Sequence, residues 1–311
     1  AIIDEIVAKT VSKLKEDGLL EDTFVFYFGD HGGVLPRSKG YLYDSGLHVP
    51  LVVRVPENFR HLIDGAPGRR VNGFVSFVDF GPTVLQLAGI DVPDHMDGQP
   101  FLGPGVPLAE VNARNESFGY ADRFDEKYDL VRSIRRGKYH YIRNYQPYLP
   151  DGLNNNYRYK MLAYDQWRQM FERGELSGPQ LQFFETKPVE MLFDVEADPH
   201  EIHNLAGDPQ YADTLLELRG RLLQIVKGLP DLSFYPESHL VQHAMDNPVR
   251  FGQEHRSEIA TLVNTANLAL LPYEQAEPKL RRALAADNPM VRYWAAMVCS
   301  AFADQAMDLV D

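Results

Sequence analysis

The sequence predicts an α/β protein with a mixed, mostly parallel sheet flanked by helices, then a smaller α+β subdomain with an antiparallel sheet, then an all-α C-terminal segment. Three observations predict this order. Residues 24–28 (FVFYF) and 50–55 (PLVVRV) are apolar without alternation, which is typical of strands covered on both faces. Residues 130–143 contain two short strand-like runs, which predict a hairpin. From about residue 253 the apolar residues follow a helical period.

Length and composition fit a folded chain of two or three domains. It has 311 residues, of which 44% are hydrophobic and 24% are charged. We expect an α/β domain at 1–119, an α+β subdomain at 120–235, and a linker with HEAT-like helices at 236–311. The net charge of −13 disfavours nucleic acid as a main partner, because phosphate backbones bind basic surfaces. No apolar run is long enough to predict a membrane span.

The first domain is expected to begin with an amphipathic helix at residues 2–16, which Gly18 ends. The two apolar strands follow, separated by a polar, glycine-containing loop. Residues 75–89 predict a second helix, with Asp79 or Gly81 as a cap and Pro82 at the first helical position. Helices that alternate with buried strands favour a sheet with helices on its outside.

The subdomain is expected to contain the hairpin, one later strand and several helices. Arg136-Gly137 lies between the two hairpin strands. The later elements are helices at 160–173 and 178–184, a strand at 190–195 and a strongly amphipathic helix at 208–227. Residues 228–252 have a linker-like composition.

The C-terminal segment predicts three helices. They cover residues 256–270, 273–286 and 289–303, and the last begins after Asp-Asn-Pro, which is a helix-start signal. The segment is similar to a HEAT-type repeat. Its single cysteine, Cys299, lies in an apolar helical pattern and is expected to be a buried apolar residue.

Groups that could bind a ligand follow the first apolar strand. Asp30 and His31 supply a carboxylate oxygen and an imidazole nitrogen, and a divalent cation could use both. Gly32-Gly33 allow a close backbone approach, and Lys39 is a mobile positive charge. A capping aspartate, a surface histidine and a solvated lysine explain the same residues equally well.

Several stretches resemble the sulfatase family. They are DTFVFYFGDHGG with SKGYLYDSGLHVPLVV, VSFVDFGPTVLQLAGI, DRFDEKYDLVRSIRRGKYHYIRNY and MLFDVEADPHEIHNLA. The first matches a strand, Asp-His-Gly, and a Lys-Gly motif; the last matches a strand followed by Asp-Pro-x-Glu-x-x-Asn-Leu. The resemblance extends over about residues 1–235 and implies a fold similar to that of alkaline phosphatases.

The resemblance also implies an activity and a site. Members of the family bind calcium and hydrolyse sulfate esters or sulfamates, with a formylglycine nucleophile made in a C/S-x-P-x-R motif. Asp30 and His31 fall on two metal ligands, and Lys39 falls on the lysine that contacts the sulfate and assists the leaving oxygen. The implied substrate is a sulfated small molecule or glycan, and many relatives are periplasmic, extracellular or lysosomal.

The sequence departs from the family pattern in two respects. It contains no C/S-x-P-x-R motif, and Cys299 is followed by SAFAD. The paired aspartates, the lysine and the histidines that belong to the first half of the family pattern are also absent. We therefore expect the C-terminal part of a sulfatase, whose nucleophile and remaining metal ligands lie in an N-terminal half of the same protein. The chain by itself is expected to be inactive. Its C-terminal helices could serve packing, homo-oligomerisation or the rim of the substrate site.

The sequence suggests roles for other polar residues near these motifs but does not decide between them. His48 could contact substrate or pack, and Asp44 is expected to brace the loop. The loop 145–157 has aromatic and amide side chains that suit sugar binding, although ordinary loop composition also explains them. We expect turn and cap roles for Asp198, Glu201 and Asn204.

Two other functions remain compatible with the sequence. One is a phosphomonoester, phosphodiester or phosphonate hydrolase of the same superfamily, which would differ in its nucleophile motif. The other is a non-catalytic interaction protein that binds a partner through its helical tail. The retained Asp30, His31 and Lys39 argue against a degenerate scaffold.

Overall fold

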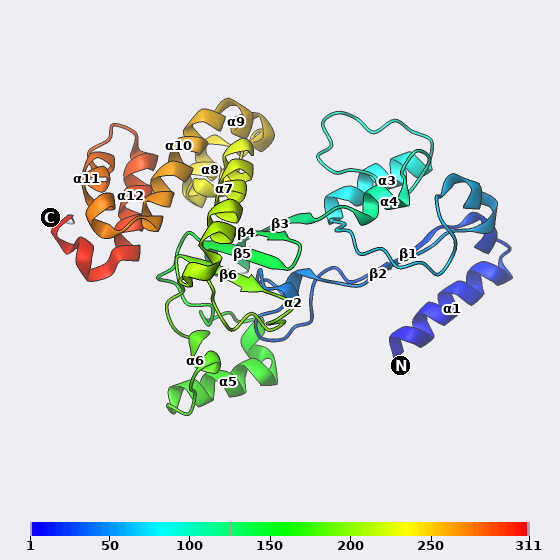
Figure 1. Cartoon of the computed structure of the whole chain (residues 1–311), viewed down its shortest axis with the longest axis horizontal. Helices are drawn as coiled ribbons and strands as arrows, with labels where there is room; N and C mark the ends of the chain where they lie inside the picture. The colour runs from blue at the N-terminus through cyan, green and yellow to red at the C-terminus, as the bar shows by residue number, and fades with distance from the viewer. Residues whose placement is uncertain (1, 125, 310–311) are drawn as a thin grey trace. The chain divides into compact units, whose positions relative to one another are not determined.

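The computed structural model describes residues 2–124 and 126–309, and their contacts form two compact units (Figure 1). The first unit comprises the chain up to Asp30 together with Val49–Ser117. The second comprises His31–His48 and the chain from Phe118 onwards. The segment that follows the first strand is therefore packed with the C-terminal part of the chain. Among the described residues, no helix combines the length and apolar character that a membrane span needs.

The described part of the first unit contains three α-helices, three short 3-10 helices and the two strands β1 and β2. Its elements are α1 (Ile2–Glu16), η1 (Leu20–Asp22), β1 (Val25–Phe28), β2 (Leu51–Arg54), η2 (Glu57–Leu62), η3 (Phe77–Asp79), α3 (Phe80–Leu87) and α4 (Leu108–Asn112). Gly18, with φ of 71°, ends α1 as predicted. Asp79 stands at the N-cap position of α3 but makes no side-chain cap hydrogen bond to it. Its Oδ2 instead accepts from the Ser76 amide at 2.9 Å, in the capping box of η3.

The two strands of the first unit run antiparallel. Val25 lies opposite Arg54, and Phe28 lies opposite Leu51. The described residues therefore do not contain the predicted mostly parallel sheet. The predicted burial on both faces is also not found, since neither strand has a buried residue and Phe28 and Val52 are 41% and 60% exposed. An unbroken apolar run says nothing about the direction of the neighbouring strand. Here the second run simply returns alongside the first, as antiparallel strands can.

The second unit is built on a four-stranded sheet with the order β3-β4-β5-β6. The strands are β3 (Glu116–Phe124), β4 (Lys127–Arg136), β5 (Tyr139–Asn144) and β6 (Glu190–Asp194). The predicted hairpin is confirmed: β4 and β5 pair antiparallel from Arg136 opposite Tyr139, and Gly137 turns with φ of 57°. β6 continues the sheet antiparallel to β5.

Helices supply most of the remaining second unit. They are α2 (Asp44–Leu47), η4 (Arg158–Lys160), α5 (Leu162–Glu172), α6 (Pro179–Gln182), η5 (Pro209–Tyr211), α7 (Ala212–Gly228), η6 (Leu232–Phe234), α8 (Glu237–His243), α9 (Pro248–Glu254), α10 (Arg256–Ala266), η7 (Asn267–Leu270), α11 (Tyr273–Leu284), α12 (Pro289–Phe302) and η8 (Ala303–Leu309). Asn288 caps α12, since its side chain accepts from the Met290 and Val291 amides, as Asp-Asn-Pro predicts.

Residues 228–252 are not an extended linker. They contain η6, α8 and α9, and the side chains of Phe234 and Tyr235 are 0% and 1% exposed. The Pro, Asp and Asn residues that suggested a linker are helix-start residues: Asn247 caps α9, and Pro248 is its first residue. The adjacent aromatic residues Phe234 and Tyr235 are the feature of this sequence that indicates a packed segment.

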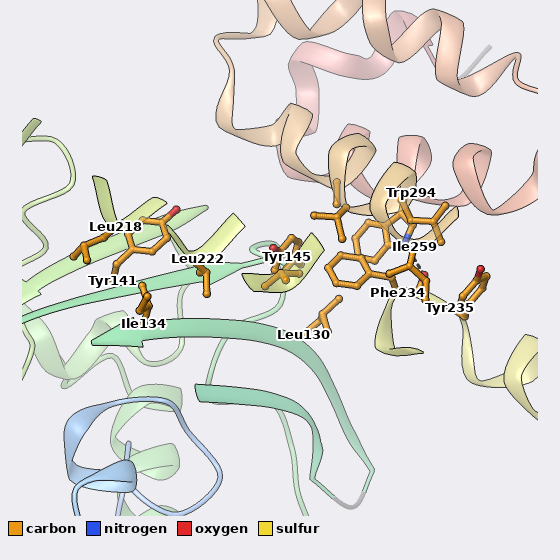
Figure 2. Close-up of a cluster of buried hydrophobic side chains, with 14 of the residues drawn as sticks. Leu130, Ile134, Tyr141, Tyr145, Leu218, Leu222, Phe234, Tyr235, Ile259 and Trp294 are labelled. Atoms are coloured by element: carbon orange, nitrogen blue, oxygen red, sulfur yellow. Dashed lines mark hydrogen bonds between the residues drawn. The ribbon is translucent and has the colours of Figure 1, made fainter. Parts of the chain in front are cut away.

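One face of the sheet packs against α7 and the C-terminal helices (Figure 2). Alternation along the strands points Leu130, Ile134, Tyr141 and Leu192 toward this face. The facing side chains are Leu215, Leu218, Leu222 and Val226 from α7, then Phe234, Ile259 and Trp294 farther along the chain. The helical tail therefore shares a continuous core with the sheet.

The opposite face of the sheet packs against the loop that follows β1. Its strand residues are Val131, Ile142, Met191 and Phe193, and its loop residues are Tyr41, Leu42 and Tyr43. The Tyr43 ring lies 6.5 Å from the Phe193 ring, measured between centroids. This packing fixes the segment that carries Lys39 to the sheet.

Trp294 tests whether the tail and the sheet unfold together. It is 2% exposed, and its Nε1 donates to the Phe234 carbonyl at 2.7 Å. We expect Trp294→Ala to lower the free energy of unfolding by about 3–5 kcal/mol, because it removes a large core side chain. Chemical denaturation would measure this. Leu216→Ala, at a side chain that is 58% exposed, should change the free energy of unfolding by less than about 0.5 kcal/mol. A loss below about 1 kcal/mol in Trp294→Ala would contradict a shared core.

Candidate functional site

The candidate site begins where β1 ends. The Gly29 amide donates to the Pro50 carbonyl at 3.2 Å, and Asp30 follows with an exposed side chain. His31 is half-buried, and its Nδ1 lies 2.7 Å from the Gly32 carbonyl oxygen. Because a carbonyl oxygen only accepts, Nδ1 is the donor in this contact. Asp30 and His31 thus present one carboxylate and one nitrogen of the kind that metals bind.

The loop from His31 to His48 closes on itself through glycines and serines. The Gly32 amide donates to the Gly46 carbonyl at 3.0 Å, and Ser38 Oγ donates to the Ser45 carbonyl at 2.8 Å. A Cβ on Gly46 would lie 2.5 Å from the Ser38 carbonyl oxygen, so only glycine fits there. The closely spaced glycines of this loop therefore allow its backbone segments to pack against each other.

Lys39 is half-buried beside two aromatic rings. Its Nζ lies 3.3 Å from Tyr157 Oη, 5.0 Å from the centroid of the Tyr157 ring and 6.0 Å from that of Phe124. Contact with the π face of a ring attracts an ammonium group and limits the rotamers of its long stem. Sequence reasoning missed Tyr157. The only signal was the aromatic and amide content of the loop 145–157.

Arg158 holds the backbone at Lys39. This arginine is 2% exposed; its Nη2 donates to the Lys39 carbonyl at 3.2 Å, and its Nη1 donates to Tyr41 Oη at 2.8 Å. The guanidinium carbon lies 4.1 Å from the Tyr41 ring and 4.3 Å from the Phe124 ring. Gly40 has φ of 80°, and a Cβ there would meet this guanidinium. Arg158 was not recognised from sequence.

Asp44 braces the far end of the loop, as predicted. Its Oδ1 accepts from Arg135, and its Oδ2 lies 3.4 Å from His48 Nδ1. Burial acts to raise the pKa of Asp44, but the hydrogen bond with His48 and the charge of Arg135 outweigh it and lower the pKa. The bond to Asp44 in turn raises the pKa of His48. His48 is exposed, and its contact with substrate stays a prediction.

The turn after β6 differs from expectation at one residue. Asp198 and Asn204 are turn residues as predicted: Asp198 accepts from the Ile202 and His203 amides, and Asn204 accepts from the Leu192 amide. Glu201 instead reaches the loop, and its Oε2 accepts from the Asp44 amide at 2.6 Å. This contact joins positions far apart in sequence, which local spacing does not predict.

The described residues do not bring a third histidine, cysteine or acidic side chain to Asp30 and His31. Calcium takes about six to eight oxygen ligands. Asp30 and His31 supply two donors, and residues 2–124 and 126–309 contain no group of three or more His, Cys, Asp or Glu side chains placed to hold a metal. The roles of Asp30 and His31 as metal ligands therefore stay predictions.

A cavity of about 370 Å³ lies within the second unit, next to the Lys39 loop. Its lining includes Gly40, Tyr41, Phe124, Lys127, Asp129 and Asn144. Lys127 Nζ donates to Asp129 Oδ2 at 3.0 Å. Burial lowers the pKa of Lys127, although the charge of Asp129 opposes the shift. The cavity falls within the range of about 300–1,000 Å³ that small-molecule sites occupy.

Lys39 provides a positive charge that lies beside Tyr157, and Asp30 and His31 provide a carboxylate and an imidazole after β1. Their roles as an anion contact and as metal ligands stay predictions. Such groups can stabilise negative charge on an ester that is being cleaved.

Comparison with known proteins agrees with this class. The sulfatase family model matches residues 1–90. An ulvan-active sulfatase of Formosa agariphila is 37% identical over 240 residues, which cover 77% of this chain and 39% of that protein. The multifunctional alkaline phosphatase superfamily protein PehA of Trinickia caryophylli is 28% identical over 219 residues, covering 68% of this chain and 35% of that protein. Among solved structures, BT4656 in complex with its substrate D-glucosamine-2-N,6-O-disulfate has a TM-score of 0.50 and 20% identity, covering 72% of this chain and 38% of that one.

The chain belongs to the sulfatase family and corresponds to the C-terminal part of the sulfatase fold. It spans between 35% and 39% of the length of these relatives.

The Asp44–His48 pair predicts a pH response. His48 should titrate above its usual pKa of about 6.5 in an NMR pH titration. Because the folded pKa is raised, the stability that the pair contributes is complete below about pH 6.5 and is lost as pH rises through the folded value. Asp44→Asn should lower the pKa of His48 toward about 6.5, whereas Asp246→Asn, at an exposed residue, should leave it in place. An unchanged His48 titration in Asp44→Asn would show that the pair does not form.

Proposed function

We propose that the protein containing this chain is a sulfuric ester hydrolase that acts on a sulfated carbohydrate. The observation that carries the proposal is the match of the sulfatase family model to residues 1–90, because this segment contains Asp30, His31 and Lys39. The structure supports it with a lysine that is held in place rather than free in solvent.

Asp30 and His31 are proposed to bind calcium. Asp30 would contribute a carboxylate oxygen, and His31 would contribute Nε2, since its Nδ1 is used by the Gly32 carbonyl. Bound calcium would supply positive charge beside the sulfate oxygens. The remaining ligands and the formylglycine nucleophile would lie in residues of the same protein outside these 311.

Lys39 is proposed to contact the sulfate group. Its ammonium can donate three hydrogen bonds, of which one is directed at Tyr157 Oη, so others remain for an anionic oxygen. The charge would stabilise the leaving oxygen as the sulfur–oxygen bond breaks, and the same ammonium could give that oxygen a proton. The Arg158 contact fixes the Lys39 carbonyl, which limits the volume that the ammonium can search.

A carbohydrate is the proposed substrate class for two reasons. One relative is named as ulvan-active, and the solved structure with a TM-score of 0.50 contains a disulfated glucosamine. The cavity beside the loop also combines aromatic and polar groups, including Tyr120, Asp122 and Asn144. Sugar rings use both kinds of group. We further propose that the protein is exported, as the family resemblance implies.

A phosphate or phosphonate ester hydrolase is the second candidate. The similarity to the multifunctional protein PehA favours it. A fixed ammonium and a metal serve phosphoryl and sulfuryl oxygens alike, so the residues described here do not separate the two. The relative rates on the two esters would do so.

Lys39→Ala tests the role of the lysine. In the full natural polypeptide, we expect it to lower kcat on 4-nitrophenyl sulfate by about 10²–10³-fold, because one charge that acts on the transition state is lost. Lys160→Ala is the matched control, since Lys160 is an exposed lysine of the second unit, and its kcat should stay unchanged. Equal activity of the two variants would refute the assignment of Lys39.

Asp30→Ala tests the metal assignment independently of activity. In the same polypeptide, we expect the bound calcium, measured by elemental analysis, to fall by at least about half, and EDTA to lower the melting temperature less than in the unmodified protein. Asp94→Ala removes an exposed carboxylate of the first unit and should leave the calcium content unchanged. Full calcium content in Asp30→Ala would remove Asp30 from the ligand set.

A further inference from the structure

Two backbone carbonyls of the turn after β6 bind an arginine of the Lys39 loop. Arg37 Nη1 donates to the His200 carbonyl and Nη2 donates to the Glu201 carbonyl, each at 2.7 Å. The same guanidinium carbon lies 3.9 Å from the Tyr43 ring. The planar fork of arginine suits such a paired contact, which a lysine would not reproduce.

The side chain of Glu201 binds the loop at a second point. Its Oε2 accepts from the Asp44 amide at 2.6 Å, and its Oε1 lies 2.6 Å from His140 Nδ1. Both side chains, Glu201 and His140, are 1% exposed. A buried carboxylate with two donors directed at it is held in one orientation.

His140 Nδ1 is the donor in its contact with Glu201, because a carboxylate oxygen only accepts. Glu201 Oε1 accepts this hydrogen bond, while His140 Nε2 is buried without a hydrogen-bond partner. His140, on β5, therefore acts as a fixed donor that aims Glu201 at the loop.

Both contact points have strained backbones. Arg37 has φ of 62° and Glu201 has φ of 52°, and they are two of the three non-glycine residues with positive φ among those described. Such conformations persist where surrounding contacts determine them, and they gather at functional positions. Here the contacts that determine them are the contacts between the turn and the loop.

We propose that Glu201 is a positioning residue for Lys39. Arg37 precedes Lys39 and Asp44 follows it, so the turn at 200–201 binds the loop on both sides of the lysine. Loss of one contact would let the segment between them move, and the ammonium would lose its orientation toward the sulfate. This inference rests on the proposed role of Lys39.

A double-mutant cycle tests the proposal in the full natural polypeptide with 4-nitrophenyl sulfate. We expect Glu201→Gln to lower kcat about 10–100-fold, since small displacements of a catalytic group have effects of this size, and to change KM less than about threefold. In the Lys39→Ala background, Glu201→Gln should cause no further loss. Glu196→Gln, at an exposed residue of the same turn, should keep full activity.

Other results of the double-mutant cycle would overturn either the role of Glu201 or the role of Lys39. If Glu201→Gln lowers kcat by the same factor in both backgrounds, or has no effect, the positioning role is wrong. If Lys39→Ala alone keeps full activity, the proposed function of Lys39 fails instead. If Glu201→Gln does not fold, Arg37→Lys replaces it in the cycle, because it keeps the charge and removes the paired contact. The same absence of further loss is then expected, and a multiplicative loss would overturn the proposal.

Discussion

Burial of Tyr41, Leu42 and Tyr43 on one face of the four-stranded sheet is the constraint on which the candidate site depends. The three side chains are 6%, 5% and 9% exposed. Both hydroxyls are satisfied at Asp151: Tyr41 donates to its carbonyl and Tyr43 to its Oδ2, each at 2.9 Å. Burial raises the pKa of both tyrosines, so they remain neutral donors. The loop from β1 is thereby fixed to the second unit.

Charged contacts then set the shape of the loop around Lys39. Arg158 lies on one side, and Arg135 and Glu201 reach Asp44 on the other. Buried charges of this kind add little net stability, since desolvation offsets their attraction, but an unpaired one would be costly. They therefore favour one loop conformation over its alternatives, which is what a site for a small anion requires.

Local sequence patterns predicted the elements that depend on neighbouring residues. Helical periodicity gave α1 and α7, and the hairpin at Gly137 followed from two short runs around a turn. The direction of β2 relative to β1 could not be predicted from the sequence, because apolar content does not encode strand direction. Glu201 and Tyr157 were missed for another reason: their contacts to the loop span 157 and 118 positions in the chain, and spacing carries no signal at that distance.

The ratio of kcat/KM for 4-nitrophenyl sulfate to that for 4-nitrophenyl phosphate, in the full natural polypeptide with calcium, tests the central claim most directly. The loop that carries Asp30, His31 and Lys39 matches the sulfatase family model, so we predict that the sulfate ester is the better substrate by at least about tenfold. A preference for the phosphate ester would contradict the account. It would assign the same lysine and metal ligands to phosphoryl transfer.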